Sequence, residues 1–353
     1  MNWLKNPIAK VSEQATNEAN DRQQQLTKPP GSLGKLEELA IKFSAIQKTQ
    51  KPQVKNIHIS IFAADHGVAN EGVSAFPQVV TTEMVKNFSR GGAAISVLAK
   101  ELSAKLEVVD LGTVVEAGEL DGVISSRIAQ GTANFAEQAA MTELQLEQAL
   151  QAGVAAVQRA IADGANIFIG GDMGIANTTS ATALACAYLN KDASELTGRG
   201  TGLDDKGVSH KASVIAAALK KHQANTLSDL EVLRFFGGFE IAALTGAYLY
   251  AAQQGLPVMV DGFITTAAAL AAVKINAECV NWFIYSHQSH EQGHTLILEA
   301  LAAEPLLNLN MRLGEGSGAA AAIPLVQHAC AIHANMATFA EAGVSTGDGN
   351  SGD

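Results

Sequence analysis

The chain has 353 residues, of which 47% are apolar and 17% are charged, and its formal net charge is −11. This composition provides a sizeable core and excludes a chain that is disordered throughout, while a pI of about 5.3 disfavours a nucleic-acid partner. No stretch of about 18 uncharged apolar residues predicts a membrane span, and no signal-peptide pattern is present. The three cysteines show neither CxxC spacing nor an even count, so we expect reduced, buried thiols in a cytoplasmic protein.

The N-terminal part of the chain begins with two helical patterns. Residues 10–26 have the composition of an exposed helix, and the sequence Pro29-Pro30-Gly31 interrupts it. Ser32 is then placed to cap a second helix over residues 33–47.

From residue 57 onward, short β-branched runs alternate with Ala-rich helical patterns. The runs cover residues 57–64, 106–111, 166–170, 257–261 and 280–286. Because these runs show little polar alternation, each predicts a strand that is buried on both faces. Strand–helix alternation predicts a parallel sheet with right-handed crossovers. The expected fold class is therefore α/β, a Rossmann-like parallel sheet with flanking helices.

Ligands of open α/β sheets bind beyond the carboxyl ends of the strands. The loops expected at that edge are residues 64–78, 170–180, 261–266, 286–294 and, if the C-terminal segment returns to the sheet, 311–320.

The loop GGDMGIANTTS (170–180) is the most informative of these segments. Its glycines let the backbone approach a ligand closely, and Asn177, Thr178 or Thr179 can cap the helix that follows. Free N–H groups at such a helix start favour a phosphate, although no lysine completes a Walker loop. The alternative is an ordinary tight turn between a strand and a helix.

A second glycine-rich loop, TGRGTGLDD (197–205), has GxGxG spacing and follows a helical pattern. It therefore does not predict a dinucleotide site. Arg199 and Lys211, in and after this loop, are candidates for phosphate contacts or are solvated surface charges.

Glu315 lies between Gly314 and Gly316, a sequence that suits the entry to a helix better than its interior. A desolvated carboxylate presented there would have a raised pKa and would act as a general base. The alternative is a carboxylate that only stabilises the helix macrodipole.

Two further motifs contain histidine. His290, Glu291 and His294 match HExxH, which binds zinc only on a helix. Here a strand-like run ends just before the motif and Gly293 interrupts it, so we expect a polar substrate-facing loop, with a zinc hydrolase as the alternative function. Asp65 and His66 end the first strand. Three roles are open to these two residues: an acid/base pair, a metal site, or loop residues held by hydrogen bonds. We favour the last.

The ordered motifs resemble the nicotinate-nucleotide:dimethylbenzimidazole phosphoribosyltransferase family almost from end to end. They cover residues 26–40, 64–78, 90–99, 170–184, 197–205, 237–247, 260–270, 286–294 and 307–320. The resemblance implies transfer of phosphoribose from nicotinate mononucleotide to 5,6-dimethylbenzimidazole, giving α-ribazole 5′-phosphate and nicotinate for the lower ligand of cobalamin. It implies no cofactor, no metal and a homodimer. A non-catalytic nucleotide-binding module is a second alternative.

The resemblance also implies the site residues. Glu315 is the expected base. The expected nucleotide and phosphate contacts are Gly174, Asn177, Thr178, Lys211, Asp261, Gly262, Ser289 and Gly316. The expected benzimidazole contacts are Ser74, Phe76, Gln78, Met84 and Leu313. The chain departs from the family pattern where it has Asp172 for Glu and Ala176 for Gly.

The expected domains are an N-terminal helical part of a small domain (1–55), a large α/β substrate-binding domain (56–304) and a C-terminal segment (305–345). The last segment carries the catalytic loop and completes the small helical domain. Residues 346–353 lack an apolar anchor and predict a disordered tail.

Overall fold

The structure is a computed structural model that describes residues 1–345, and the tail expected at 346–353 lies outside these described residues. The chain divides into two compact units. The larger contains Met1–Ile8 and Asn56–Ala321, and the smaller contains Ala9–Lys55 and, among the described residues, 322–345.

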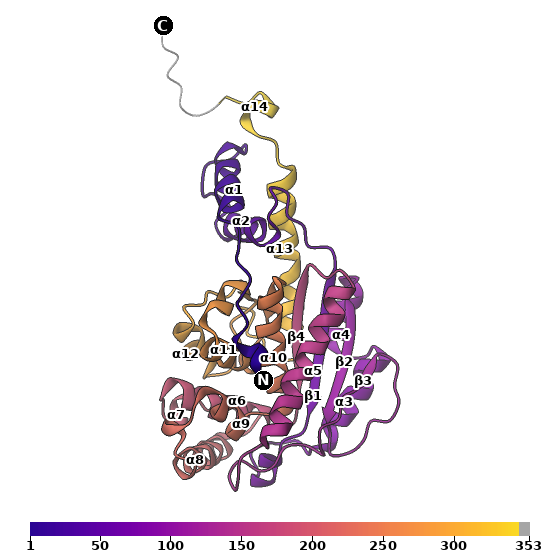
Figure 1. The fold of residues 1–353 in the computed structure, drawn as a ribbon, viewed down its shortest axis with the longest axis vertical. Helices are drawn as coiled ribbons and strands as arrows, with labels where there is room; N and C mark the ends of the chain where they lie inside the picture. Colours follow the sequence, from indigo (N-terminus) through magenta and orange to yellow (C-terminus); the bar gives the residue numbers. More distant parts are fainter. Residues whose placement is uncertain (346–353) are drawn as a thin grey trace. The chain divides into compact units, whose positions relative to one another are not determined.

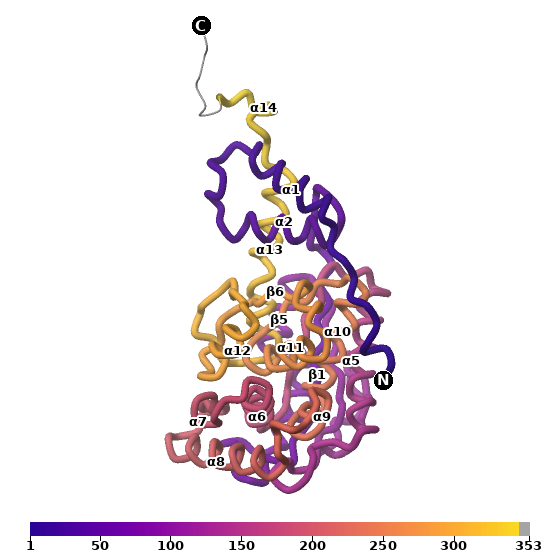
Figure 2. Tube along the Cα trace, turned by 60° about the vertical axis from the view of Figure 1, so that its left-hand side comes forward, coloured from indigo at the N-terminus to yellow at the C-terminus, as the bar shows by residue number. Residues whose placement is uncertain are grey.

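The larger unit contains a six-stranded parallel sheet in the order β3-β2-β1-β4-β5-β6. Strands β1 to β4 are labelled in Figure 1, and β5 and β6 in Figure 2. The strands are β1 (Ile57–Ala64), β2 (Lys105–Gly112), β3 (Val123–Ser125), β4 (Ile167–Met173), β5 (Val258–Val260) and β6 (Phe283–Tyr285). Every residue of β1 is buried, including the polar His58 and Ser60. The predicted α/β fold with a parallel sheet is confirmed. The short edge strand β3 was not predicted.

Helices surround the sheet in the larger unit. They are α3 (Val79–Arg90), α4 (Ala94–Glu101), α5 (Glu143–Ala162), α6 (Asn177–Leu189), α7 (Ala193–Leu196), α8 (Asp205–Lys221), α9 (Asp229–Phe236), α10 (Phe239–Gln254), α11 (Phe263–Ile275), α12 (His294–Ala300) and α13, whose residues Ser317–Asn335 continue into the smaller unit. Helices α6 to α9 form one cluster in both views of the chain (Figures 1 and 2).

Successive residues of β4 face opposite sides of the sheet. A Cβ atom built on Gly170 would meet Leu244 and Tyr248 of α10, whereas one built on Gly171 would meet the backbone of Glu315. Helix α10 therefore covers one face near the carboxyl end of β4, and the segment before α13 approaches the other face.

The smaller unit packs α1 (Glu13–Gln25) against α2 (Lys35–Gln47), together with the remainder of α13 and α14 (Phe339–Ala342). The prediction that Ser32 caps α2 is wrong, since Gly34 occupies the N-cap without a side-chain hydrogen bond. Instead, the carboxylate of Glu37 accepts a hydrogen bond of 2.9 Å from the Leu33 N–H and pairs with Lys28 at 2.8 Å. The pair is buried, so it orders the turn that the two prolines begin.

The predicted burial of the cysteines is confirmed, since Cys186, Cys279 and Cys330 are all buried and unpaired. None of the helices described in residues 1–345 is long and apolar enough to span a membrane.

Candidate active site

A cavity of about 540 Å³ lies in the larger unit, at the carboxyl ends of the strands. All five loops expected at this edge contribute to its lining. The expected site residues that line it are Phe76, Met84, Gly174, Asn177, Thr178, Gly262, Ser289, Leu313 and Glu315. The structure thus gathers residues that lie far apart in the sequence, from Phe76 to Glu315.

The N-terminus of α6 opens toward this cavity without a side-chain cap. The prediction that Asn177 or a following threonine caps the helix is wrong: Ala176 is the N-cap residue and Asn177 is already helical. The Asn177 amide instead donates a hydrogen bond of 2.9 Å to the carboxylate of Asp172. The uncapped helix start provides backbone N–H groups and a positive dipole end, which suit an anion.

Lys211 supplies a positive charge behind this helix start. It comes from α8, is fully buried, and its Nζ donates a hydrogen bond of 2.7 Å to the Thr178 hydroxyl. Burial lowers the pKa of Lys211 to about 8, and the charge of Glu291 opposes this shift. A Cβ on Gly200 would lie 2.7 Å from the Thr178 hydroxyl oxygen, so this loop position requires glycine. Arg199, by contrast, pairs with Asp205 on the surface.

Glu315 is held in an unusual backbone conformation. Its φ is +65°, and the flanking Gly314 and Gly316 have φ values of +88° and +87°. A non-glycine residue in this left-handed region costs roughly 1–2 kcal/mol, so the surrounding structure must impose it. Burial raises the pKa of the Glu315 carboxyl, and the Ile95 N–H opposes the shift. Its Oε2 is buried without a hydrogen-bond partner, which leaves a lone pair free to accept a proton.

Asp261 fixes the segment that carries Glu315. Its Oδ2 accepts a hydrogen bond of 3.2 Å from the Gly316 N–H, and its Oδ1 accepts one of 2.7 Å from the Ala319 N–H. Two residues expected to contact the nucleotide, Asp261 and Gly316, are therefore bonded to each other and do not line the cavity. Burial raises the pKa of Asp261, and the neighbouring His287 opposes the shift.

Asp172 lines the cavity beside this segment. Burial, together with the negative charges of Asp261 and Glu240, raises its pKa well above the usual range.

The side of the cavity expected to bind the base is partly open. Phe76 is 53% exposed and Leu313 is 58% exposed, although both line the cavity. Ser74 and Gln78 do not line it. The Ser74 hydroxyl bonds to the Thr201 hydroxyl at 3.1 Å, and the Gln78 amide donates to the His66 carbonyl at 3.0 Å.

Several lining residues were not predicted as contacts. They are Asp172, Met173, Ile175, Gly200, Thr201, Phe263, Ile264, His287, Glu291, Arg312 and Gly314. Most of them lie next to a predicted residue in the same loop. Membership of these loops was therefore the signal by which the sequence could have indicated them.

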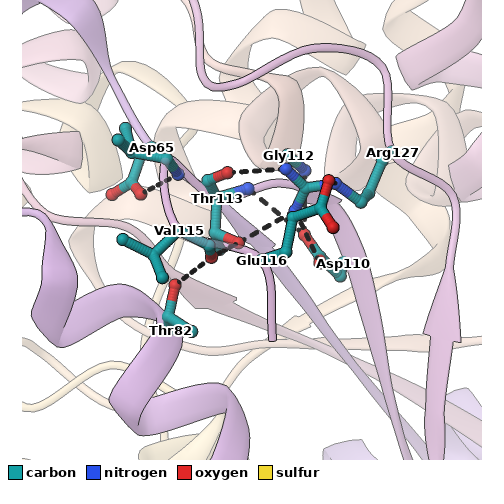
Figure 3. Close-up of polar contacts among 9 residues, drawn as sticks. Asp65, Thr82, Asp110, Gly112, Thr113, Val115, Glu116 and Arg127 are labelled. Atoms are coloured by element: carbon teal, nitrogen blue, oxygen red, sulfur yellow. Dashed lines mark hydrogen bonds and ion pairs between the residues drawn. The ribbon is translucent and has the colours of Figure 1, made fainter. Parts of the chain in front are cut away.

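Asp65 joins the end of β1 to two neighbouring segments. Figure 3 shows it beside the loop that contains Thr113 and Val115. Its carboxylate accepts hydrogen bonds of 2.6 Å from the Thr81 hydroxyl and 2.7 Å from the Val114 N–H. The same loop is held by Thr82, whose hydroxyl donates to the Val115 carbonyl, and by the ion pair of Arg127 with Asp110 at 3.0 Å. The favoured interpretation of Asp65 as a hydrogen-bonded loop residue is confirmed.

The HExxH sequence does not form a zinc-binding helix. Helix α12 begins at His294, so His290 precedes it and its side chain is exposed. Both ring nitrogens of His294 are already engaged, Nδ1 by the Ser289 N–H at 2.8 Å and Nε2 by the Thr266 hydroxyl at 2.9 Å. The two histidines therefore do not present free nitrogens on one helix face, as HExxH chemistry requires.

Comparisons with known proteins agree with this geometry. A sequence model of the family described as Phosphoribosyltransferase matches residues 8–344. A protein from Xanthomonas campestris pv. campestris (strain B100), named nicotinate-nucleotide–dimethylbenzimidazole phosphoribosyltransferase, is 56% identical over 343 residues, which are 97% of this chain and 98% of that protein. A protein of the same name from Pseudomonas putida is also 56% identical over the same shares. A crystal structure of the enzyme of this name from Thermus thermophilus is similar with a TM-score of 0.91 at 43% identity, covering 96% of this chain and 100% of that one.

Proposed function

Because the chain belongs to the phosphoribosyltransferase family, we propose that it transfers phosphoribose from nicotinate mononucleotide to 5,6-dimethylbenzimidazole. The products are α-ribazole 5′-phosphate, for the lower ligand of cobalamin, and nicotinate. Relatives that are 56% identical over 97% of the chain carry the name of this activity. Within the structure, the observation that carries the proposal is Glu315, a strained and desolvated carboxylate that faces a cavity with an uncapped helix start.

The reaction requires a base but no acid for the leaving group. One nitrogen of the benzimidazole attacks C1′ of the nucleotide, and the C1′–N bond to the pyridinium ring breaks. The electron pair of that bond neutralises the pyridinium nitrogen, so nicotinate leaves without protonation. The proton on the other benzimidazole nitrogen passes to Glu315. Attack from the face opposite the leaving group converts the β-linkage to an α-linkage.

The raised pKa of Glu315 makes its carboxylate a stronger base than an exposed glutamate. A positioned general base contributes roughly 10²–10⁴-fold to the rate. Positioning of the two substrates contributes more, up to about 7–11 kcal/mol in favourable cases.

The phosphate of the nucleotide would bind at the start of α6, close to Thr178 and to the buried charge of Lys211. Gly262 and Ser289 line the same cavity and would contact the ribose. Asp261 would act indirectly, since its carboxylate is committed to the backbone that carries Glu315. Phe76, Met84 and Leu313 would contact the flat faces and methyl groups of the base.

The open side of the cavity supports the further proposal of a homodimer. Phe76 and Leu313 would wall the base, yet more than half of each side chain is exposed. Exposed Val79, Val114 and Val115 add apolar surface on and beside α3. A second subunit over this surface would exclude water from the base.

The three buried, unpaired thiols support a reducing compartment such as the cytoplasm.

The proposal is tested by incubating the purified protein with nicotinate mononucleotide and 5,6-dimethylbenzimidazole. Chromatography with mass detection should show nicotinate and the ribazole phosphate in equal amounts, and removal of either substrate should abolish both. Release of nicotinate without the base would instead indicate a hydrolase, and binding without turnover would indicate a non-catalytic module.

A further inference from the structure

A fully buried histidine–carboxylate pair lies beneath the phosphate-binding turn. His66 follows β1 and Glu240 belongs to the first turn of α10; neither has any exposed surface. His66 Nε2 and Glu240 Oε1 are 2.6 Å apart, and His66 Nδ1 lies 2.9 Å from the Ser180 hydroxyl in α6. One imidazole ring therefore connects three elements, the end of β1 and the first turns of α6 and α10.

The turn between β4 and α6 rests on this pair. A Cβ built on Gly174 would lie 2.5 Å from the Ala64 carbonyl oxygen, 3.2 Å from His66 Nε2 and 3.3 Å from Glu240 Oε1. A Cβ built on Gly238, the N-cap residue of α10, would lie 2.2 Å from His66 Cε1. Both glycines thus allow backbone to pack directly on the pair, and Gly174 itself lines the cavity.

The turn needs such support because it contains a residue in an unfavourable conformation. Ala176 has a φ of +75°, in the left-handed region that favours glycine. The Cβ of an L-residue is strained there, so an isolated turn with this sequence would relax to another conformation. A strained backbone persists where its surroundings over-determine it.

We propose that His66 and Glu240 form a positioning pair that holds the Gly174–Ala176 turn and the first turn of α6 in the conformation that binds the nucleotide phosphate. Neither side chain lines the cavity, so the pair acts through Gly174 and Ser180 and does not touch the substrate. This inference rests on the proposed function, because it names the group that the positioned turn would bind.

A positioning role and simple electrostatics predict opposite effects on nucleotide binding when the charge of Glu240 is removed. Removing the charge of Glu240 takes a buried negative charge away from an anion site, which by itself would favour phosphate binding. A positioning pair predicts the opposite result, because the imidazole loses its charge-assisted hydrogen bond and the turn loses its support. Weaker binding of the nucleotide in Glu240→Gln therefore identifies positioning as the cause.

The chain contains a matched control at the opposite end of the same strand. His58, near the start of β1, lies 3.6 Å from the carboxylate of Glu107, and both residues are buried. Glu107 also pairs with Arg159 at 2.8 Å. Glu107→Gln therefore also removes a buried negative charge, but at a position far from the turn. We expect it to lower thermal stability at least as much as Glu240→Gln does.

The experiment measures nicotinate mononucleotide and 5,6-dimethylbenzimidazole binding to the full-length protein by calorimetry, with melting temperatures and steady-state kinetics for each variant. For Glu240→Gln we expect the Kd and KM of the nucleotide to rise about tenfold, the factor for converting a charge-assisted hydrogen bond into a neutral one. The Kd of the base and the kcat at saturating nucleotide should stay unchanged. Glu107→Gln should leave all four quantities unchanged.

Equal effects of Glu240→Gln and Glu107→Gln on nucleotide affinity, or equal weakening of both substrates in Glu240→Gln, would overturn the positioning pair. If Glu240→Gln does not fold, His66→Gln provides the same comparison, since glutamine lacks the second ring nitrogen that contacts Ser180. The wild-type protein is measured first. If the wild-type protein fails to bind and turn over the nucleotide, the proposed function itself is overturned. If the wild type is active but the variants show no loss of nucleotide affinity, only the positioning pair is overturned.

Discussion

The backbone carbonyl of Glu315 packs directly on Gly171 of β4. A Cβ atom on Gly171 would lie 2.4 Å from that carbonyl oxygen and 2.7 Å from its carbon, closer than nonbonded atoms approach. The sheet therefore supports the left-handed Glu315 backbone only because a central strand contains glycine at this position. This contact sets the height of the carboxylate above the edge of the sheet.

Gly171→Ala is therefore expected to reduce kcat strongly. The added methyl group meets backbone and not a flexible side chain, so the Glu315 segment must shift. A displacement of about 1 Å at a reacting group costs roughly 10²-fold in rate. Gly170→Ala is the matched control, since its methyl group points to the opposite face, where it meets the side chains of Leu244 and Tyr248. Steady-state kinetics that show the same kcat for both variants would contradict this account of the site.

The pH dependence of nucleotide capture should report Lys211. Burial lowers its pKa to about 8, and only the protonated form attracts phosphate. The kcat/KM for nicotinate mononucleotide should thus fall as pH rises through about 8, while kcat at saturation falls less, because bound phosphate favours the protonated lysine. In Lys211→Met, kcat/KM should be low throughout and this step should be absent. If the step near pH 8 persists in Lys211→Met, the step belongs to the titration of another group.

Sequence reasoning predicted the strands that carry a strong local signal. The run IHISIFAA matches β1 residue for residue, because its three isoleucines and Phe62 strongly favour a strand even though His58 and Ser60 are polar. β3 has only three residues, which is too short for any periodicity to be visible. The glycines around Glu315 likewise predicted a carboxylate at a helix entry, and α13 begins two residues later.

The support of the site was not predictable in the same way, because it depends on contacts between distant segments. Asp261 bonds to the backbone N–H groups of Gly316 and Ala319, and Lys211 reaches Thr178 from another helix. Side-chain capping of α6 was predicted from residue preference alone, whereas Asn177 is drawn to Asp172 by a hydrogen bond that only the folded turn creates. Residue preferences for the cap position do not include hydrogen bonds to residues that only the fold brings close.

His290→Ala should retain substantial activity, and chelators should not inhibit the wild-type protein. The His290 side chain is exposed, and it precedes the helix on which a zinc ligand would have to lie. Its loss should cost about 1 kcal/mol or less, the scale of one hydrogen bond. His294→Ala is the contrasting variant, because the buried His294 ring holds Ser289 and Thr266 and its loss should lower the melting temperature. Inactivation by a chelator, restored by zinc, would contradict this expectation.

The most direct test of the central claim, that Glu315 takes the proton of the attacking base, is the kcat of Glu315→Gln measured beside its affinity for nicotinate mononucleotide. Glutamine keeps the shape of the side chain but cannot accept the proton, so kcat should fall by roughly 10²–10⁴-fold. The Kd for the nucleotide, measured by calorimetry, should stay close to that of the wild type, because the proposed phosphate site at the start of α6 and Lys211 does not include Glu315. A kcat near the wild-type value in a folded Glu315→Gln protein would contradict the assignment of Glu315 as the base.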